Sequence, residues 1–584
     1  MKKLLALVVA ALMIMTMAIP AMAAVTMDTS IAVNGLMAGD QYKLYQVLTW
    51  DQSAGAWKLA PGFTGLQLNG KTAEADVVKE ITDGITQAEA NVIAAQIATG
   101  SPAVKASGTI ATGSTSFSYA IDSATDTSTL GLYMAIITAG TPEYVYNPMF
   151  LAADFETNTT SAINATSAYT SGLAKRQQIT LTKTTSDSNQ TLEEAIDSYV
   201  GEEVTFDVNT TIPVFLDSYK NPSFVIYDNI ETVGIDLDAD SIEITLGTTT
   251  YAKTASGAKL AYDDDIFTVS ATGGNQGSYT ITFDKDWLDA NTTAVPVHVQ
   301  YKGTITNTAE FNLNEDNNTV TVTYSNGPEN EKGAMRDRTN HYTFSIGAKA
   351  FGGGDDAGKT YELVKVAVDE NGKPVVEKRL VSEWNTSVER HPLAGATFGL
   401  YTDSSCTTPY TNDLYPSGAT FVTGADGVIT FKGLAAGDYY LQEISAPGGY
   451  IADSRIVHVN IAATYESVTV PDAEESGIKV KGYTVDVLKS YTVTVNNVSV
   501  YDSTDEEYEA ATDAVVTTYE FDNDGLHTSS MTTTSTNDSD LINTQGVALP
   551  STGGVGTTIF YVAGMMMVLG AGTILVARRK ADEE

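Results

Sequence analysis

The sequence predicts a mainly β protein built from tandem immunoglobulin-like β-sandwich domains. Polar and apolar residues alternate with a period of two in segments rich in β-branched and aromatic residues, such as 278–283, 320–324 and 491–495. Glycine, asparagine and aspartate interrupt these segments at short intervals, which favours sandwiches over β-α-β units. The chain of 584 residues is long enough for about three or four such domains.

The first predicted domain covers residues 24–172 and is decorated with short helices. Within 72–98, apolar residues recur at the spacing of one helix face among acidic and polar neighbours. These residues are Val77, Val78, Ile81 and Ile85. We therefore expect one or two surface helices in an otherwise β domain.

Changes in composition predict the remaining domain boundaries. A Ser/Thr/Ala-rich stretch at 158–172 closes the first domain, and a stretch of glycine and acidic residues at 352–358 precedes the third. The second sandwich domain is therefore predicted at 173–350, and the third at 351–546.

The amino terminus has the three regions of a secretory signal peptide. Lys2 and Lys3 precede an apolar run at 4–19, and the small residues Ala21 and Ala23 come after it. This order predicts a signal peptide at 1–23 and an exported mature chain.

The carboxyl terminus predicts a membrane segment preceded by a short motif. The apolar run at 559–577 contains no charged residue, and as a helix with a rise of about 1.5 Å per residue it nearly crosses a hydrocarbon core of about 30 Å. Three cations that should stay cytoplasmic come after it, at 578–580. The motif before it, within the terminal segment 547–584, is Leu549, Pro550, Ser551, Thr552 and Gly553.

This order resembles the LPxTG cell-wall sorting signal of Gram-positive surface proteins. The resemblance implies that a sortase cysteine attacks the Thr552 carbonyl, releases the segment that begins at Gly553, and passes the acyl group to an amine. It also implies a secreted protein that is anchored to peptidoglycan. The alternative is an ordinary tail anchor that contains the pentapeptide by chance.

Charge and composition exclude several kinds of partner and site. The 72 acidic and 33 basic residues give a net charge of −39, which repels nucleic acid and anionic lipid. Cys406 is the single cysteine, so the exported chain forms no intrachain disulfide. The five histidines show no metal-ligand spacing. We therefore expect no metal, no cofactor and no enzymatic activity.

Three sequence motifs in the third predicted domain resemble the collagen-adhesin B-type domain of Gram-positive pilins. They lie at 393–401, 427–434 and 439–450. The last motif matches the pilin E-box. Motifs at 224–228, 307–309 and 322–326 resemble a second pilin domain, and 39–47 resembles the amino-terminal one. The resemblance implies inverse immunoglobulin-like sandwiches in a sortase-dependent fimbrial subunit.

The same resemblance implies intramolecular Lys-Asn isopeptide bonds, which would replace the missing disulfides. Burial lowers the pKa of a lysine so that its neutral amine attacks an amide carbon, while a buried protonated carboxyl group donates and shuttles protons. The second-domain candidates are Lys183, Asp228 and Asn326. The third-domain candidates are Lys365, Glu443 and Asn543, with Asn496 or Asn497 as alternatives to Asn543. The competing interpretation for each lysine or asparagine is a solvated strand residue.

Polymerisation requires one more lysine, near the junction of the first two domains. The Tyr-Pro-Lys motif that this family usually has there is missing, and Lys175 is the candidate in its place. We therefore predict the shaft subunit of a covalent pilus, joined from Thr552 to Lys175, with sortase, further pilin subunits and peptidoglycan as partners and a host surface or matrix ligand as a further one. The alternatives are a monomeric wall-anchored adhesin, a terminal pilus subunit or, more remotely, a surface hydrolase.

Overall fold

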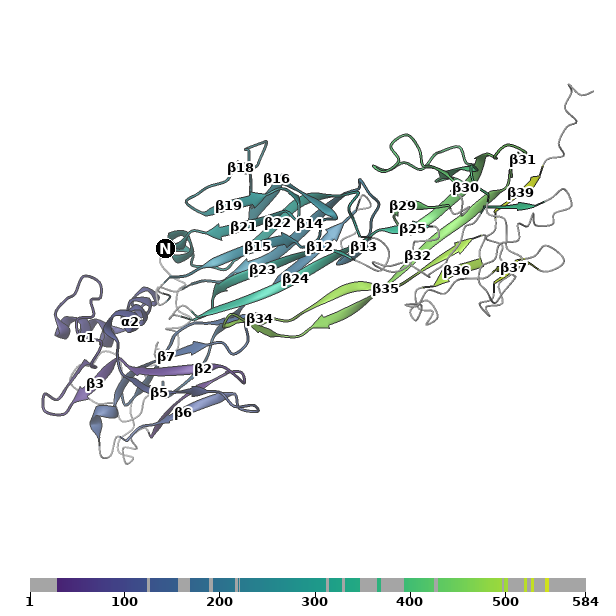
Figure 1. Ribbon diagram of the computed structural model, residues 1–584. Helices are drawn as coiled ribbons and strands as arrows, with labels where there is room; N and C mark the ends of the chain where they lie inside the picture. Colours follow the sequence, from purple (N-terminus) through teal and green to yellow (C-terminus); the bar gives the residue numbers. More distant parts are fainter. Residues whose placement is uncertain are drawn as a thin grey trace, which may run out of the picture. The chain divides into compact units, whose positions relative to one another are not determined.

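The structure is a computed structural model of the chain, drawn as a ribbon in Figure 1. It describes residues 29–122, 126–155, 169–187, 193–215, 219, 221–310, 315–327, 331–346, 365–368, 393–424, 429–495, 498–502, 519–521, 527–529 and 541–545. Strands predominate among these residues, so the mainly β class is confirmed. The predicted signal peptide at 1–23 and the predicted sorting segment at 547–584 lie outside the described part.

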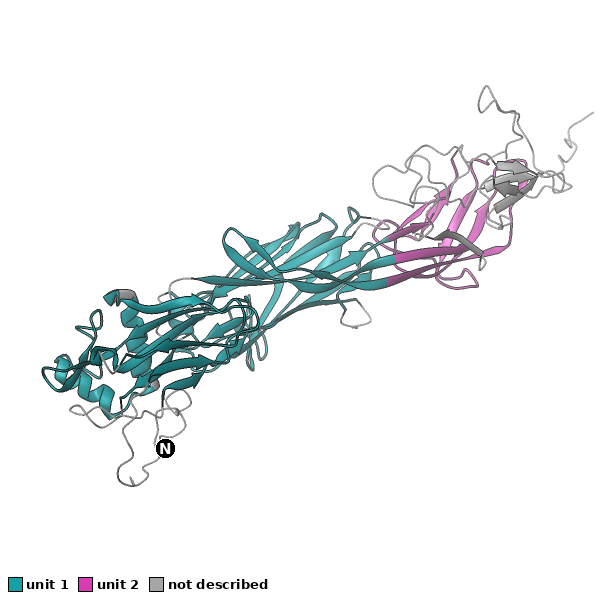
Figure 2. Cartoon of the chain, turned by 90° about the horizontal axis from the view of Figure 1, so that it is seen from below, with its two compact units in different colours: residues 1–310, 315–343, 465–489 teal, residues 311–314, 344–464, 490–584 magenta. Residues whose placement is uncertain are grey.

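The chain divides into two compact units, which Figure 2 shows in different colours. Unit 1 comprises residues 1–310, 315–343 and 465–489, and unit 2 comprises 311–314, 344–464 and 490–584. The sequence placed 465–489 inside the third domain, whereas its contacts group this segment with unit 1. The predicted domain limits near 172 and 350 stay predictions.

The amino-terminal part of unit 1 is built from several small sheets. A four-stranded sheet has the order β5 (Val104–Thr109), β2 (Gln41–Gln46), β7 (Gly131–Thr138) and β9 (Met149–Ala153). A three-stranded sheet has the order β10 (Ser171–Leu173), β1 (Ser30–Asn34) and β6 (Ser116–Ala120). Two-stranded pairs are β3 (Leu48–Asp51) with β4 (Ala56–Leu59), and β11 (Arg176–Gln178) with β8 (Tyr144–Tyr146).

Two helices accompany these sheets, as the spacing predicted. They are α1 (Glu74–Asp83) and α2 (Gln87–Gly100). The Thr86 side chain caps α2 by accepting a hydrogen bond from the Glu89 amide, and the Glu89 carboxylate accepts one from the Thr86 amide. The buried face of the two helices contributes to the same hydrophobic core as the sheets, so these helices are packed elements of the fold.

The second part of unit 1 contains two large sheets. The first has the order β12 (Leu181–Ser186), β14 (Glu203–Ile212), β22 (Val295–Ile305), β16 (Ile235–Leu246), β17 (Thr249–Ala252) and β18 (Leu260–Ala261), with β20 (Gly274–Asn275) beside β16. The second has the order β19 (Phe267–Thr272), β21 (Ser278–Phe283), β15 (Phe224–Ile230), β23 (Asp316–Ser325), β24 (Lys332–Tyr342), β34 (Ile478–Lys481) and β33 (Ala473–Glu475), with β13 (Ala195–Asp197) beside β24. The short helix α3 (Lys285–Ala290) comes after β21.

Alternation along the strands of these sheets separates a buried face from a more exposed one. In β22 the buried positions include Val297, Val299 and Tyr301, and in β23 they include Val320, Val322 and Tyr324. Such a period of two is what a sandwich requires, because successive side chains of a strand point to opposite faces.

A hairpin from the carboxyl-terminal half of the chain completes the second sheet of unit 1. Strand β34 pairs in parallel with β24, and β33 pairs with β34. Figure 1 shows β34 beside β24. The flanking strands β32 (Ile456–Val470) and β35 (Tyr483–Val495) each have residues in both units. We call the segment 465–489 the arm.

Unit 2 is centred on a sheet with the order β28 (Thr420–Val422), β27 (Thr397–Tyr401), β30 (Gly437–Ser445), β32, β35 and β36 (Val498–Asp502). Smaller sheets pair β25 (Phe344–Ile346) with β29 (Phe431–Leu434), β39 (Leu541–Gln545) with both β26 (Lys365–Val368) and β31 (Tyr450–Ile451), and β37 (Tyr519–Phe521) with β38 (His527–Ser529). Its buried residues include Leu400, Phe431, Leu441, Val459 and Tyr491.

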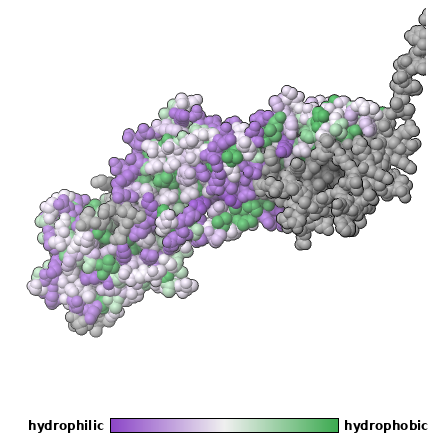
Figure 3. Space-filling model, in the orientation of Figure 1, coloured by the Kyte–Doolittle hydropathy of each residue, from purple (hydrophilic) through white to green (hydrophobic). Residues whose placement is uncertain are grey.

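Hydrophilic residues are the main component of the surface that Figure 3 colours, and hydrophobic ones form small, scattered groups on the face drawn there. Within the residues that the structure describes, no helix is both long and apolar enough to cross a membrane. The predicted span at 559–577 lies outside those residues.

Candidate crosslinking site

Lys183 has an unusual position for a lysine side chain. It lies in the sandwich formed by the two large sheets of unit 1, which we call the second sandwich. It lies on β12 and is completely buried, with 0% of its surface exposed. Its Nζ lies 2.5 Å from Asp228 Oδ2 and 2.6 Å from the Tyr301 hydroxyl oxygen. A lysine amine is seldom buried without such partners, because the charged form loses its hydration.

Strand register explains why these side chains meet. In the first sheet, Lys183 pairs with Val208 on β14, and Phe206, two residues away on the same face, pairs with Tyr301 on β22. In the second sheet, Asp228 on β15 pairs with Tyr279 on β21. The hydrogen bonds from Lys183 and Tyr301 to Asp228 therefore join the inner faces of the two sheets.

One asparagine shares this cluster, and it is Asn318 on β23. Its Nδ2 donates a hydrogen bond of 2.6 Å to the Tyr301 hydroxyl oxygen, the oxygen that also accepts from Lys183. The Tyr301 hydroxyl donates to Asp228 Oδ1 at 2.9 Å, and the Tyr279 hydroxyl donates to Asp228 Oδ2 at 3.4 Å. We call Lys183, Asp228, Tyr301 and Asn318 the crosslinking cluster.

Aromatic rings surround the Lys183 amine. The Phe206 and Tyr301 rings stack with centroids 4.9 Å apart, and Lys183 Nζ lies 5.4 Å and 5.2 Å from these two centroids. Tyr279 meets Tyr301 edge to face at 5.0 Å. These rings exclude solvent and hold the polar atoms in a medium of low dielectric constant.

Burial also shifts the pKa values of the Lys183 amine and the Asp228 carboxyl group. It lowers the pKa of the Lys183 amine and raises the pKa of the Asp228 carboxyl group, although each partly offsets the shift of the other. Both directions favour a neutral amine beside a protonated carboxyl group. A neutral amine is nucleophilic and a protonated carboxyl group donates, so the cluster holds the groups that amide exchange needs.

Asn326, the asparagine predicted for this site, lies elsewhere. It comes just after β23, and its backbone amide donates to the Glu331 carbonyl oxygen at 3.0 Å. The β15–β23 register pairs Asp228 with Val320 and Phe224 with Tyr324. Asn326 is therefore beyond the far end of β15 from Asp228, whereas Asn318 is two residues from the position opposite it. The structure brings Lys183 and Asp228 together, but with Asn318.

Lys175, the predicted acceptor for polymerisation, lies between β10 and β11 and is partly exposed. Its carbonyl oxygen accepts a hydrogen bond from the Asn147 amide at 3.1 Å, and the preceding Ala174 amide donates to the Asn34 carbonyl oxygen at 2.8 Å. The next residue, Arg176, lies over the Tyr144 ring at 4.8 Å. The backbone that carries Lys175 is thus held from several sides.

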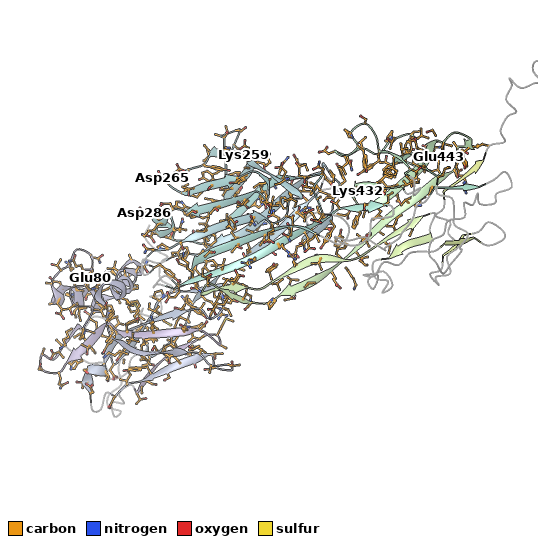
Figure 4. All side chains as sticks on the ribbon, in the orientation of Figure 1. Glu80, Lys259, Asp265, Asp286, Lys432 and Glu443 are labelled. Carbon is orange, nitrogen blue, oxygen red and sulfur yellow. The ribbon has the colours of Figure 1, made fainter. Side chains whose placement is uncertain are left out.

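The third-domain candidates are described only in part. Glu443 lies on β30 and is labelled in Figure 4; it is buried, and its Oε2 accepts from the Asp453 amide at 2.8 Å. For Lys365 and Asn543 the structure describes the backbone: β26 and β39 are parallel, with Lys365 opposite Leu541 and Asn543 opposite Ala367. The strands of these two candidates are therefore neighbours. Asn496, Asn497 and residues 549–553 lie outside the described part.

Matches to known protein families agree with this fold. Residues 385–474 match the SpaA prealbumin-like fold domain, and residues 542–583 match the LPXTG cell wall anchor motif. The structure is similar to the T6 backbone pilin of serotype M6 Streptococcus pyogenes, with a TM-score of 0.50 and 18% identity over 80% of this chain and 94% of that one. The chain has a pilin fold.

Two further relatives are similar over most of their length. The pilin-like chain is 25% identical over 472 residues to the trypsin-resistant surface T6 protein of Streptococcus pyogenes serotype M6, which covers 77% of this chain and 79% of that protein. The full-length major pilin SpaD of Corynebacterium diphtheriae has a TM-score of 0.42 and 15% identity over 72% of this chain and 88% of its own. The resemblance to sortase-dependent pilus subunits that the sequence indicated is confirmed.

The anchor match also gives the location of this pilin-like chain. It is a surface protein that is anchored at the cell wall and has a structural rather than an enzymatic role. Among the residues that the structure describes, no group of three His, Cys, Asp or Glu side chains is arranged to hold a metal ion.

Proposed function

We propose that this chain is the shaft subunit of a sortase-assembled pilus and that a Lys183–Asn318 amide bond fastens its second sandwich. The observation that carries the proposal is the crosslinking cluster, in which an amine, a carboxyl group and a carboxamide are sealed between two sheets. Burying these groups costs free energy. Making a covalent bond from them is a chemical reason to keep them there.

The proposed reaction exchanges one amide for another. The neutral Lys183 amine attacks the Asn318 side-chain carbon, the new carbon–nitrogen bond forms, and the bond to the original Asn318 nitrogen breaks. That nitrogen leaves as ammonia, and Asp228 supplies and recovers protons on the way. The folded sandwich supplies proximity, so the reaction requires no further enzyme.

A crosslink of this kind suits an exported chain whose single cysteine is Cys406. It closes a loop of roughly 135 residues, and the chain-entropy estimate for such a loop is about 5 kcal/mol of stabilisation. We propose a second crosslink between Lys365 and Asn543, with Glu443 as its carboxyl group. The parallel pairing of β26 with β39 supports this choice of asparagine.

Polymerisation is proposed to join Thr552 of one subunit to Lys175 of the next, and the last subunit is proposed to be attached to peptidoglycan. The LPXTG match at 542–583 supports processing by a sortase. The similarity to a backbone pilin supports a place in the shaft. The backbone hydrogen bonds around Lys175 support a fixed position for the residue to which the next subunit is joined.

Intact-mass measurement of the exported ectodomain tests the crosslinks. Each bond releases one ammonia and lowers the mass by about 17 Da. We expect Asn318→Ala to lose one of these decrements and Asn326→Ala, its matched control, to keep all of them. An unshifted mass in the wild-type protein would refute the crosslinks.

Immunoblots of wall extracts test the place of the chain in the shaft. The wild-type protein should give a ladder of high-mass species that disappears in Lys175→Ala and persists in Lys105→Ala. A single wild-type band would instead favour a monomeric adhesin or a terminal subunit.

A further inference from the structure

We infer that the Tyr301 hydroxyl carries a proton from Asp228 to the departing nitrogen of Asn318 during crosslink formation. This inference rests on the proposed function, because it assigns a role within the Lys183–Asn318 reaction. It makes Tyr301 a catalytic residue of the site.

The position of one oxygen atom is the basis for the assignment. The Tyr301 hydroxyl oxygen lies 2.6 Å from Lys183 Nζ, 2.9 Å from Asp228 Oδ1 and 2.6 Å from Asn318 Nδ2. The nucleophile, the acid and the leaving nitrogen therefore all contact the same hydroxyl group. In the described structure, the contact between the Asp228 carboxyl group and the Asn318 amide runs through this oxygen.

The surroundings leave few other groups for this task. Asn318 is completely buried, and its Oδ1 has no hydrogen-bond partner among the described residues. Swapping the oxygen and nitrogen of this amide would place the carbonyl oxygen on the Tyr301 hydroxyl, where it would accept a hydrogen bond. In either orientation, Tyr301 is the residue that reaches the reacting amide.

The relay balances the protons of the reaction. After Lys183 Nζ has attacked the Asn318 carbon, Tyr301 gives its proton to Nδ2 and takes one from the Asp228 carboxyl group. The carbon–nitrogen bond breaks and ammonia leaves. Asp228 regains a proton from the new amide nitrogen, which began with the two protons of a neutral amine and ends with one. No oxidant, reductant or bound water is consumed.

Two features keep the phenol suited to this role. Burial raises the pKa of Tyr301 well above its ordinary value, so the hydroxyl keeps its proton between transfers. The stacked Phe206 ring and the edge contact with Tyr279 hold the ring in one orientation.

Tyr301→Phe tests the relay, because it removes one oxygen and keeps the ring. Tyr279→Phe is the matched control: its hydroxyl also contacts Asp228, but at 3.4 Å, and the described structure gives it no contact with Asn318. The reaction is monitored during cell-free synthesis of the full ectodomain, with samples quenched in acid and the crosslinked peptide measured by mass spectrometry. Far-UV circular dichroism of the purified variants checks that they fold.

The relay predicts that folded Tyr301→Phe forms the Lys183–Asn318 bond at least about 100-fold more slowly than the wild-type protein, the usual size of a general acid–base contribution. Tyr279→Phe should stay within about threefold. Equal rates for Tyr301→Phe and the wild-type protein would overturn the relay while the crosslink stands. A wild-type protein without the bond would overturn the proposed function itself.

A second measurement applies if Tyr301→Phe does not fold. The wild-type rate is compared in H₂O and D₂O, and the relay predicts about a twofold or larger decrease, because protons move in the slow step. An unchanged rate would overturn the relay.

Discussion

At the scale of single residues, burial sets the protonation of several groups in the second sandwich. It lowers the pKa of Lys183 and raises that of Asp228 in the cluster. On β24 it raises the pKa of Asp337 to about 7 and lowers that of His341 to about 3. Each of these shifts favours the neutral form of the group concerned.

Asp337 gives a prediction about pH. Its Oδ2 accepts a hydrogen bond from the Lys183 backbone amide at 2.6 Å. Because its folded pKa of about 7 lies above its ordinary value of 3.8, its contribution to stability is complete below about pH 4 and is lost as the pH rises through 7. Asp337→Asn should therefore unfold with the wild-type protein at pH 4 but at a higher temperature at pH 8.

The expected difference at pH 8 is several degrees. One pKa unit corresponds to about 1.4 kcal/mol. Half of the rise in the Asp337 pKa from 3.8 to about 7 therefore changes the free energy of unfolding by roughly 2 kcal/mol. In a domain of 150–250 residues this shifts the unfolding temperature by about 4–8 °C. Thermal unfolding at both pH values measures it, with exposed Asp286→Asn as the control. A gain of equal size at pH 4 and pH 8 would contradict the role of Asp337 ionisation.

The sequence predicted two members of the crosslinking cluster and missed the others. Asp228 lies in the segment 224–228 that resembles a pilin domain, and Lys183 is the lysine that the same resemblance implies as its partner. Asn318 was missed because β23 has two asparagines near its start and Asn326 follows its end, and the register between β15 and β23 decides which asparagine lies near Asp228. Tyr301 was missed because a tyrosine in an alternating strand is usually a core residue. The local sequence pattern of a strand does not predict which distant strand it pairs with, or in which register.

At the scale of elements, the arm gives β24 a partner along its edge. Gly333, Ala334 and Met335 pair with residues 479–481 of β34. Arg336 makes a bidentate ion pair with Glu475, in which Nη1 donates to Oε1 and Nη2 donates to Oε2, each at 2.8 Å. An uncovered edge strand is a place where other chains add, so the arm protects the sheet from such association.

Val480 on β34 should control the docking of the arm. It is 5% exposed and pairs with Ala334, so Val480→Asp would place a charge in an apolar contact. Losing the burial of one valine costs about 1.5–3 kcal/mol, and the undocked population should rise at least tenfold. Limited trypsin digestion and mass spectrometry of the products would then show faster cleavage after Lys481.

The matched control for the arm is Val468→Asp, because Val468 lies on β32 and is 42% exposed. It adds the same charge to the arm and should leave cleavage after Lys481 unchanged. Equal cleavage of Val480→Asp and the wild-type protein would mean that the arm does not depend on this contact. The sequence predicted no strand within the arm, and the local pattern of a strand does not say which sheet it joins.

At the scale of the whole molecule, the proposed crosslinks decide how the chain carries tension. Lys175 lies eight positions before Lys183 in the sequence, so a pull applied through Lys175 soon reaches the first bonded residue. The Lys183–Asn318 bond then passes the load to β23. The residues between Lys183 and Asn318 stay folded and carry no load, because the path through the Lys183–Asn318 bond is shorter than the extended chain between these two residues.

Single-molecule pulling on the full ectodomain, held at its two ends, tests this path. Asn318→Ala breaks the bond and should add an unfolding step of about 45 nm, since roughly 135 residues extend by about 3.4 Å each. The wild-type protein and the Asn326→Ala control should not show this step. If the wild-type trace contained it, Lys183 and Asn318 would not be joined, whereas if all three traces lacked it, load would bypass the second sandwich by another route. The length of the step thus identifies the bonded pair, because bonds closing at Asn318 and at Asn326 would differ by eight residues, or about 3 nm.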